Sequence, residues 1–277
     1  NPPAFEQLFD INVLLVGNIH LTAQPTSSLI ALVILLTVVA LVWFTPILGL
    51  LVQSLRPAGD VASSGWWVAL LQPTQLVLDN YAALIQNPDM VRSFWNTFYI
   101  TVPSTILVTT LAALAGYAFA WIKFPGRDVS FLVVVGLLVV PVQLALIPLA
   151  RMFGDLGLFG TIPGVILFHT GFGLPFAIFL LRNFFIGVPS ELLDSARVDG
   201  ANEFVAFTRI ILPLAAPALA SLAIFQFMWV WNDLLVALIF ADPTVAPLTA
   251  AIQRQTRNFG QNVDVIAPGA FLQTLVP

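Results

Sequence analysis

Charged side chains gather in one stretch of this apolar chain, residues 189–213. The stretch reads PSELLDSARVDGANEFVAFTRIILP, and the long apolar runs on either side of it carry only Arg182. A segment this polar between two such runs belongs in water. Its chemistry suits ion pairing and the docking of a partner, because the chain shows no cluster of a nucleophile with its base, or of metal ligands, that catalysis would need.

The same stretch predicts two short helices instead of one membrane span. Pro189 makes a reasonable helix start, Gly200 a break between the two helices, and Asp199 a candidate cap for the second helix. The second helix would carry one apolar stripe, formed by Phe204, Phe207 and Ile211. Such a stripe could lie on a membrane surface or fill a partner's groove, so an ordinary solvated loop and a docking element both fit the pattern.

The spacing of these residues resembles the "EAA" loop of the membrane subunits of binding-protein-dependent ABC importers. Asp194-Ser195-Ala196 stands at the Glu-Ala-Ala position, and Gly200 follows at the family's spacing. Asp-Ser replaces Glu-Ala, which keeps one acid and one small residue. The resemblance implies that these residues dock an ATPase: Glu191, Asp194, Ser195, Ala196, Asp199, Gly200, Arg209, Ile210, Leu212 and Pro213.

The composition is that of a membrane protein. Hydrophobic residues make up 59% of the chain and charged residues 9%, with a mean hydropathy of +0.96, whereas charged residues are about a quarter of a soluble domain. The chain has no cysteine, which excludes disulfides and thiol nucleophiles, and its net charge of -4 gives no sign of nucleic-acid binding. Residues 1–28 lack the basic front end of a signal peptide and predict an amphipathic segment at the membrane interface.

Apolar runs predict an all-α, polytopic membrane protein with about six spans in a domain of residues 29–277. Five runs are long enough to cross a bilayer and a sixth is only begun: 29–52, 96–121, 129–150, 161–186, 214–240 and 267–277. Since about ten residues cannot cross the core, we expect the sixth span to be truncated, and the start at Asn1 suggests a few missing residues. The Lys and Arg residues divide evenly between the two sides, so they leave the orientation undecided.

Polar and aromatic residues late in the fifth run are candidates for a transport path. Helical geometry places Gln226, Trp229 and Asp233 on one face, and polar residues in a span usually face the bundle interior or a cavity. Helix packing with interfacial Trp residues explains them equally well. The full candidate set is Gln143, Gln226, Trp229, Asn232 and Asp233. The lone His169 fits a hydrogen-bonded helix contact better than a metal ligand or proton relay.

The polar region 241–267 is too long for a simple helix connection. Its polar side chains could bind a partner outside the cell, although a mobile solvated loop would look the same. The candidate contacts are Arg254, Arg257, Asn258 and Gln261.

The resemblance is closest to the maltose-permease-like subunits of carbohydrate importers, and Gly65-Trp66-Trp67 is similar to a sequence of the α-glucoside members. It implies the type I permease fold in the inner membrane, with a coupling loop at residues 187–213. The implied partners are a second permease subunit, two copies of an ATPase, an extracytoplasmic solute-binding protein and membrane lipid. ATP and Mg would bind in the partner subunits, so this chain would be neither an enzyme nor a cofactor protein.

Two other functions compete with the importer. A secondary transporter would use an ionisable residue at mid-membrane, and Asp233 is the candidate carboxylate within the runs. A structural membrane subunit would leave the spacing of residues 189–213 unexplained. Co-purification with an ATPase and a second permease would separate these possibilities.

Overall fold

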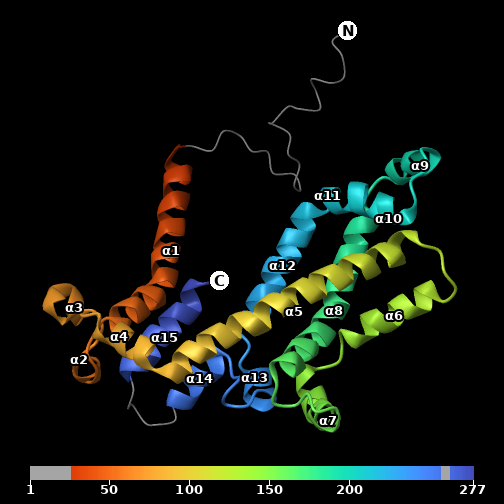
Figure 1. The fold of residues 1–277 in the computed structure, drawn as a ribbon. Coiled ribbons are helices and arrows are strands. Elements are labelled where there is room, and N and C mark those ends of the chain that lie inside the picture. The colour runs from red at the N-terminus through yellow and green to blue at the C-terminus, as the bar shows by residue number, and fades with distance from the viewer. Residues whose placement is uncertain (1–25, 257–262) are drawn as a thin grey trace. The chain divides into compact units, whose positions relative to one another are not determined.

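The computed structural model describes residues 26–256 and 263–277, all of which lie in helices, turns or connecting segments without a strand (Figure 1). The all-α prediction is therefore confirmed. The predictions for residues 1–25, and those for Arg257, Asn258 and Gln261, lie outside the described residues. The chain divides into two compact units, residues 1–50 and 51–277, which we describe separately.

The first unit consists, in its described part, of most of helix α1 (Thr26–Ser54). Residues 29–54 are long and apolar enough to cross a membrane, and none of the side chains in their most apolar window is buried. The hydroxyl groups of Thr37 and Thr45 donate to the carbonyl oxygens of Val33 and Leu41, one helical turn earlier. Because these hydroxyls are satisfied within the helix, the exposed part of α1, residues 29–48, presents no unpaired polar group to lipid.

Two long helices form the centre of the second unit, α5 (Pro88–Trp121) and α8 (Ile162–Ile186), and they pack along each other (Figure 1). Each begins at a side-chain cap, from Asn87 and Thr161 respectively, followed by a proline in the first turn. At Gly116 the two helices approach so closely that a Cβ would stand 3.1 Å from the backbone nitrogen of Arg182. Both helices are long and apolar enough to cross a membrane.

Two of the predicted spans are broken. The run 129–150 is not one straight helix, because α6 (Arg127–Leu137) and α7 (Val142–Asp155) meet at an angle of 102°. Helix α6 ends at Leu137, and Pro141, which has no N–H and sits in an extended conformation, stands directly before α7. The run 214–240 is likewise divided into α12 (Ala216–Trp231) and α13 (Leu235–Phe240). Asp233 accepts from the N–H groups of Val236 and Ala237, so its carboxylate starts the second helix.

The segment between α1 and α5 is organised around a buried arginine. Arg56 is 0% exposed, and its guanidinium donates to side-chain or backbone oxygens of Gln53, Asp60, Ser64 and Gln75. Four short helices follow in this segment: α2 (Ala58–Ser63), α3 (Val68–Leu71), η2 (Pro73–Gln75) and α4 (Asp79–Gln86). The Arg56 side chain reaches α2 and η2, and the Asn80 side chain of α4 donates to the backbone carbonyl oxygens of Ser54 and Arg56.

The region 241–267 also differs from the long loop predicted from its polarity, since it contains helix α14 (Leu248–Thr256) and the start of α15 (Val263–Leu275). The Asn96 side chain donates to the carbonyl oxygens of Thr244 and Ala246, and the Leu248 N–H donates to the Thr97 hydroxyl. Buried polar groups of α5 therefore hold the entry to α14 in place. Two reciprocal hydrogen bonds also join α12 to α15. Trp231 Nε1 donates to the backbone carbonyl oxygen of Gln273, and Gln273 Nε2 donates to the backbone carbonyl oxygen of Trp231.

Candidate coupling loop and helix pocket

The charged stretch folds into consecutive short helices, as its sequence predicted. These are α9 (Ser190–Val198), α10 (Glu203–Ala206), a π-helical turn η3 (Phe207–Ile211) and α11 (Leu212–Leu214). Gly200 breaks the first two with φ of 86°, a left-handed conformation that favours glycine. The predicted cap was wrong. Asn202, and not Asp199, caps α10 by accepting from the Val205 N–H at 2.9 Å.

A chain of polar contacts joins this loop to the core of the molecule. Arg197 donates to Asp194 at 3.2 Å and to Glu203 through two nitrogens at 3.0 and 3.1 Å. The other carboxylate oxygen of Glu203 accepts from the hydroxyl of Tyr117, on α5, at 2.6 Å. The hydrogen bond to Glu203 raises the pKa of the already cationic Arg197. Tyr117 is only 4% exposed and packs on Phe207, so α9 and α10 are fastened to α5.

The surface of the loop is open for a partner. Leu193 turns inward and is fully buried, whereas none of the ten predicted docking residues is buried. Val198 is 87% exposed and Phe204 70% exposed, which places apolar surface beside the charged groups. The predicted stripe is therefore divided, because Phe207 and Ile211 point into the core while Phe204 does not. Val198 was missed, since a single valine in a polar helix carries no pattern.

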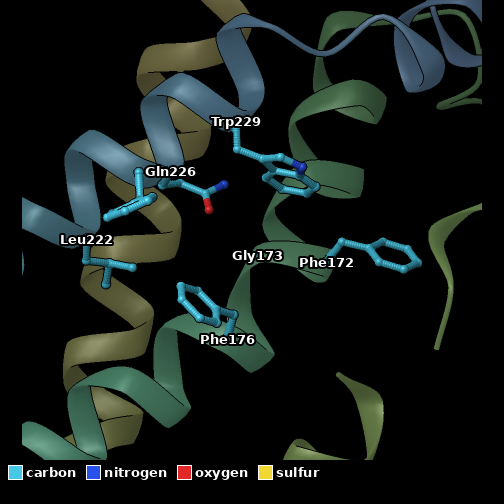
Figure 2. A pocket seen from close by; sticks show the side chains of 7 residues that line it. Phe172, Gly173, Phe176, Leu222, Gln226 and Trp229 are labelled. Carbon is cyan, nitrogen blue, oxygen red and sulfur yellow. The ribbon is translucent and has the colours of Figure 1, made fainter. Parts of the chain in front are cut away.

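A pocket of about 290 Å³ lies between α8 and α12 (Figure 2). Figure 2 shows the carboxamide of Gln226 reaching from α12 toward α8, with the rings of Trp229 and Phe176 on either side of it. The lining residues are Phe172, Gly173, Phe176, Leu222, Phe225, Gln226 and Trp229. Four of these were not predicted as site residues: Phe172, Phe176, Leu222 and Phe225. Apolar residues in a membrane span give no sign of a cavity in the sequence.

The predicted path residues are only partly brought together. Gln226 and Trp229 line the pocket, but Asp233 does not, since α12 ends at Trp231 and the helical face assumed for Asp233 is interrupted. Asn232 is exposed and donates to the carbonyl oxygen of Met228 at the end of α12. Gln143 is exposed on α7 and is not among the lining residues. The shared face predicted for Asp233 is therefore corrected, whereas the path roles of Asn232 and Gln143 stay predictions.

His169 connects the pocket to Asp233. Its ring packs edge-on against Trp229 with 5.2 Å between centroids, and its Nε2 lies 3.7 Å from Asp233 Oδ2. Residues 26–256 and 263–277 contain no group of three or more His, Cys, Asp or Glu side chains that could hold a metal ion. His169 is thus buried between Trp229 and Asp233, and its Nδ1 has no hydrogen-bond partner in the described chain, unlike the hydrogen-bonded helix contact that we predicted.

Arg254 is the one predicted binding-protein contact within the described residues. Its side chain is half-buried and its Nη2 lies 3.4 Å from the carbonyl oxygen of Ala241. The other three, Arg257, Asn258 and Gln261, fall in the range that the structure leaves out.

Comparison with known proteins gives consistent matches. Residues 108–276 match the family described as "Binding-protein-dependent transport system inner membrane component". The "Osmoprotective compounds uptake permease protein GgtD" of Synechocystis sp. is 46% identical over 244 residues, covering 86% of this chain and 82% of that protein. The "Alpha-glucoside transport system permease protein AglG" of Rhizobium meliloti is 49% identical over 212 residues, covering 74% of this chain and 56% of that protein.

The fold also matches a solved structure. A chain of "a bacterial ABC transporter involved in the import of the acidic polysaccharide alginate" aligns with a TM-score of 0.72, covering 92% of this chain and 94% of that chain. The sequences are 19% identical, so the likeness concerns the fold alone. The predicted importer-permease fold is confirmed.

Proposed function

Because the chain belongs to the family of binding-protein-dependent transport system inner membrane components, we propose that it is one permease subunit of an ATP-driven importer for a sugar or glycoside. It would lie in the inner membrane as a multi-pass protein and form part of the translocation path. The relatives named above for α-glucosides and osmoprotective compounds support the substrate class.

The coupling loop carries the proposal. Residues 187–213 combine an exposed charged and apolar surface with a fixed connection to α5, which is what a lever between an ATPase and a membrane helix needs. The loop would occupy a groove on one of two ATPase subunits. ATP and Mg would bind in those subunits, so the hydrolysis step belongs to the partners and this chain has no catalytic role.

The remaining partners follow from the same proposal. A second permease subunit would complete the path, and an extracytoplasmic solute-binding protein would deliver the sugar. The region around α14 is the proposed contact for that protein. Its packing against α5 would give such a contact a firm base.

An ion-coupled transporter is less well supported by the geometry. Its one candidate carboxylate, Asp233, already accepts two backbone N–H groups at the start of α13. A carboxylate used as a helix cap is poorly placed to bind and release a coupling ion.

A bulky residue on the docking surface tests the proposal. Ala196→Trp should abolish both sugar uptake and co-purification of the ATPase, because a docked interface loses hot-spot contacts worth several kcal/mol, on the order of 2 to 4. Ala62→Trp is the matched control, since Ala62 is exposed on α2 and lies outside the loop. Normal uptake and normal ATPase binding by a correctly inserted Ala196→Trp protein would contradict the assigned role of the loop.

A further inference from the structure

The pocket between α8 and α12 contains a polar group that the described chain leaves unsatisfied. Gln226 is only 6% exposed, and its Nε2 has no hydrogen-bond partner. Buried amide groups are nearly always hydrogen-bonded, because an unpaired one loses its interactions with water without replacement. The carboxamide of Gln226 lines the pocket, so a ligand there could supply the missing acceptor.

Gly173 makes the room for this carboxamide. A Cβ at this position would stand 2.7 Å from Gln226 Oε1 and 2.9 Å from Gln226 Nε2, closer than real Cβ contacts. Gly173 is itself buried within α8, where glycine is a weak helix former. The two helices therefore accommodate the amide at the cost of helix propensity, which favours a role for the amide over simple space filling.

Aromatic rings form the walls around the amide (Figure 2). Trp229 is held by His169, whose ring meets it at an interplanar angle of 89°. A pyranose ring carries apolar C–H groups on its faces and hydroxyl groups around its rim, so aromatic walls with one carboxamide suit it. The pocket volume of about 290 Å³ lies at the lower end for small-molecule sites and suits one sugar ring.

None of the seven lining residues is charged. A carboxylate entering this pocket would lose its hydration without meeting a Lys or Arg side chain among the lining residues. We propose that the pocket binds one uncharged pyranose ring of the transported glycoside, with Gln226 as its hydrogen-bonding residue, and rejects uronate rings. The inference rests on the proposed function, and it adds the charge class of the substrate and the residue that reads it.

A lipid acyl chain is the other occupant that an apolar pocket could take. The unpaired amide disfavours it, since an acyl chain offers no hydrogen-bond acceptor at that depth. The experiment below separates the two occupants.

The chain has no cysteine, so Phe176→Cys introduces a unique reporter at the pocket. We expect a water-soluble maleimide to label it in membranes of cells that produce the full-length chain with its natural partners. At least one neutral probe among methyl α-D-glucopyranoside, trehalose and diacetylchitobiose should slow labelling, whereas methyl α-D-glucuronide should not. Leu144→Cys is the control, because Leu144 is exposed on α7 and does not line the pocket. Its labelling should not respond to any sugar.

Gln226→Leu, added to Phe176→Cys, should raise the half-protecting sugar concentration about tenfold, as expected for one lost buried hydrogen bond. Phe225→Cys serves as a second reporter in case the Phe176 ring is itself needed for binding. Equal protection by glucoside and glucuronide, no protection by any neutral probe at either reporter, or an unchanged value in Gln226→Leu would overturn the proposal. So would reporters that are labelled only after lipid is stripped away, which would identify an acyl chain as the occupant.

Labelling requires neither ATP nor uptake. A negative result here, together with normal sugar uptake by the wild-type importer, would reject the pocket and leave the proposed function standing. Protection of the pocket reporter by sugar, together with no ATP-dependent uptake, would support the pocket and reject the proposed function.

Discussion

Replacing Tyr117 with phenylalanine removes one hydroxyl group and leaves the ring packing of α5 on Phe207 in place. That hydroxyl is the link between the membrane helix and the coupling loop, since it donates to Glu203 at 2.6 Å. Hydrogen bonds to charged groups contribute about 1.5 to 3 kcal/mol. Glu203 keeps Arg197 as a partner and can take up water at its half-exposed carboxylate, so we expect the net loss to be about 1 to 2 kcal/mol.

A loss of this size changes the equilibrium between a fastened and a loosened loop by a factor of about 5 to 30. The ATPase subunits should still dock, because Tyr117 is buried and does not contribute to the exposed surface of α9. Movement of the docked ATPase subunits would then displace α5 less, because the loop is less firmly attached to that helix. We therefore expect ATP hydrolysis to continue while the sugar imported per ATP falls several-fold.

The assay is uptake of a radiolabelled sugar and phosphate release, measured together in vesicles containing the reconstituted importer. Tyr99→Phe is the matched control, because Tyr99 lies on the same helix with an exposed ring and should leave the ratio unchanged. If Tyr117→Phe imports as much sugar per ATP as the wild-type protein, the hydroxyl does not couple the loop to α5. A parallel fall of hydrolysis and uptake would instead indicate lost docking.

Three further predictions concern packing. Arg56→Met should lower the free energy of unfolding by about 3 to 5 kcal/mol, because it leaves several buried oxygens unpaired. Urea or thermal unfolding measures this loss. The control Arg92→Met, which removes an exposed ion pair, should lower it by less than about 1 kcal/mol. Gly116→Leu should prevent α5 from closing on α8 and abolish folded, detergent-stable protein in size-exclusion chromatography, whereas Gly136→Leu, with open space around it, should be tolerated. Trp231→Phe should expose α15 to proteolysis by removing its hydrogen bond to Gln273, at a cost of about 1 kcal/mol, and the exposed Trp95→Phe should not; unchanged cleavage would refute the anchor.

The sequence predicted best those features that depend on local chemistry. Long apolar runs and the break at Gly200 are encoded within a few residues, and the helices α8 and α9 formed where expected. Helix α5 ends at the predicted residue but begins at Pro88, eight residues before the predicted start. The two broken spans departed from the prediction at their turns. Pro141, in an extended conformation, precedes α7, and the side chain of Asp233 accepts from the N–H groups at the start of α13, in runs whose hydropathy continued through both breaks.

The tertiary parts of the site could not be predicted in the same way. The partner of Glu203 lies 86 positions away at Tyr117, and the partners of Asn96 lie about 150 positions away in the chain. Hydropathy cannot indicate such pairs, because Tyr117 reads as one more apolar residue of a span. Gly173 shows the same limit, since its value comes from a carboxamide on another helix.

The π-helical turn at Phe207–Ile211 gives a different meaning to the end of the loop signature. Proline within a helix removes an N–H and crowds the carbonyl four residues before it, which for Pro213 is that of Arg209. A π turn is wider than an α turn, and here it ends at Ile211, two residues before Pro213. The chain then bends by 75° between Leu214 and the start of α12. The beginning of the signature, Asp194 to Ala196, is thus part of the exposed surface, while its end is a bend of the backbone between the loop and α12. Substitutions at the two ends would then have different effects. Those at the beginning would change which partner binds, and those at the end would change the direction in which movement of the bound partner displaces α12.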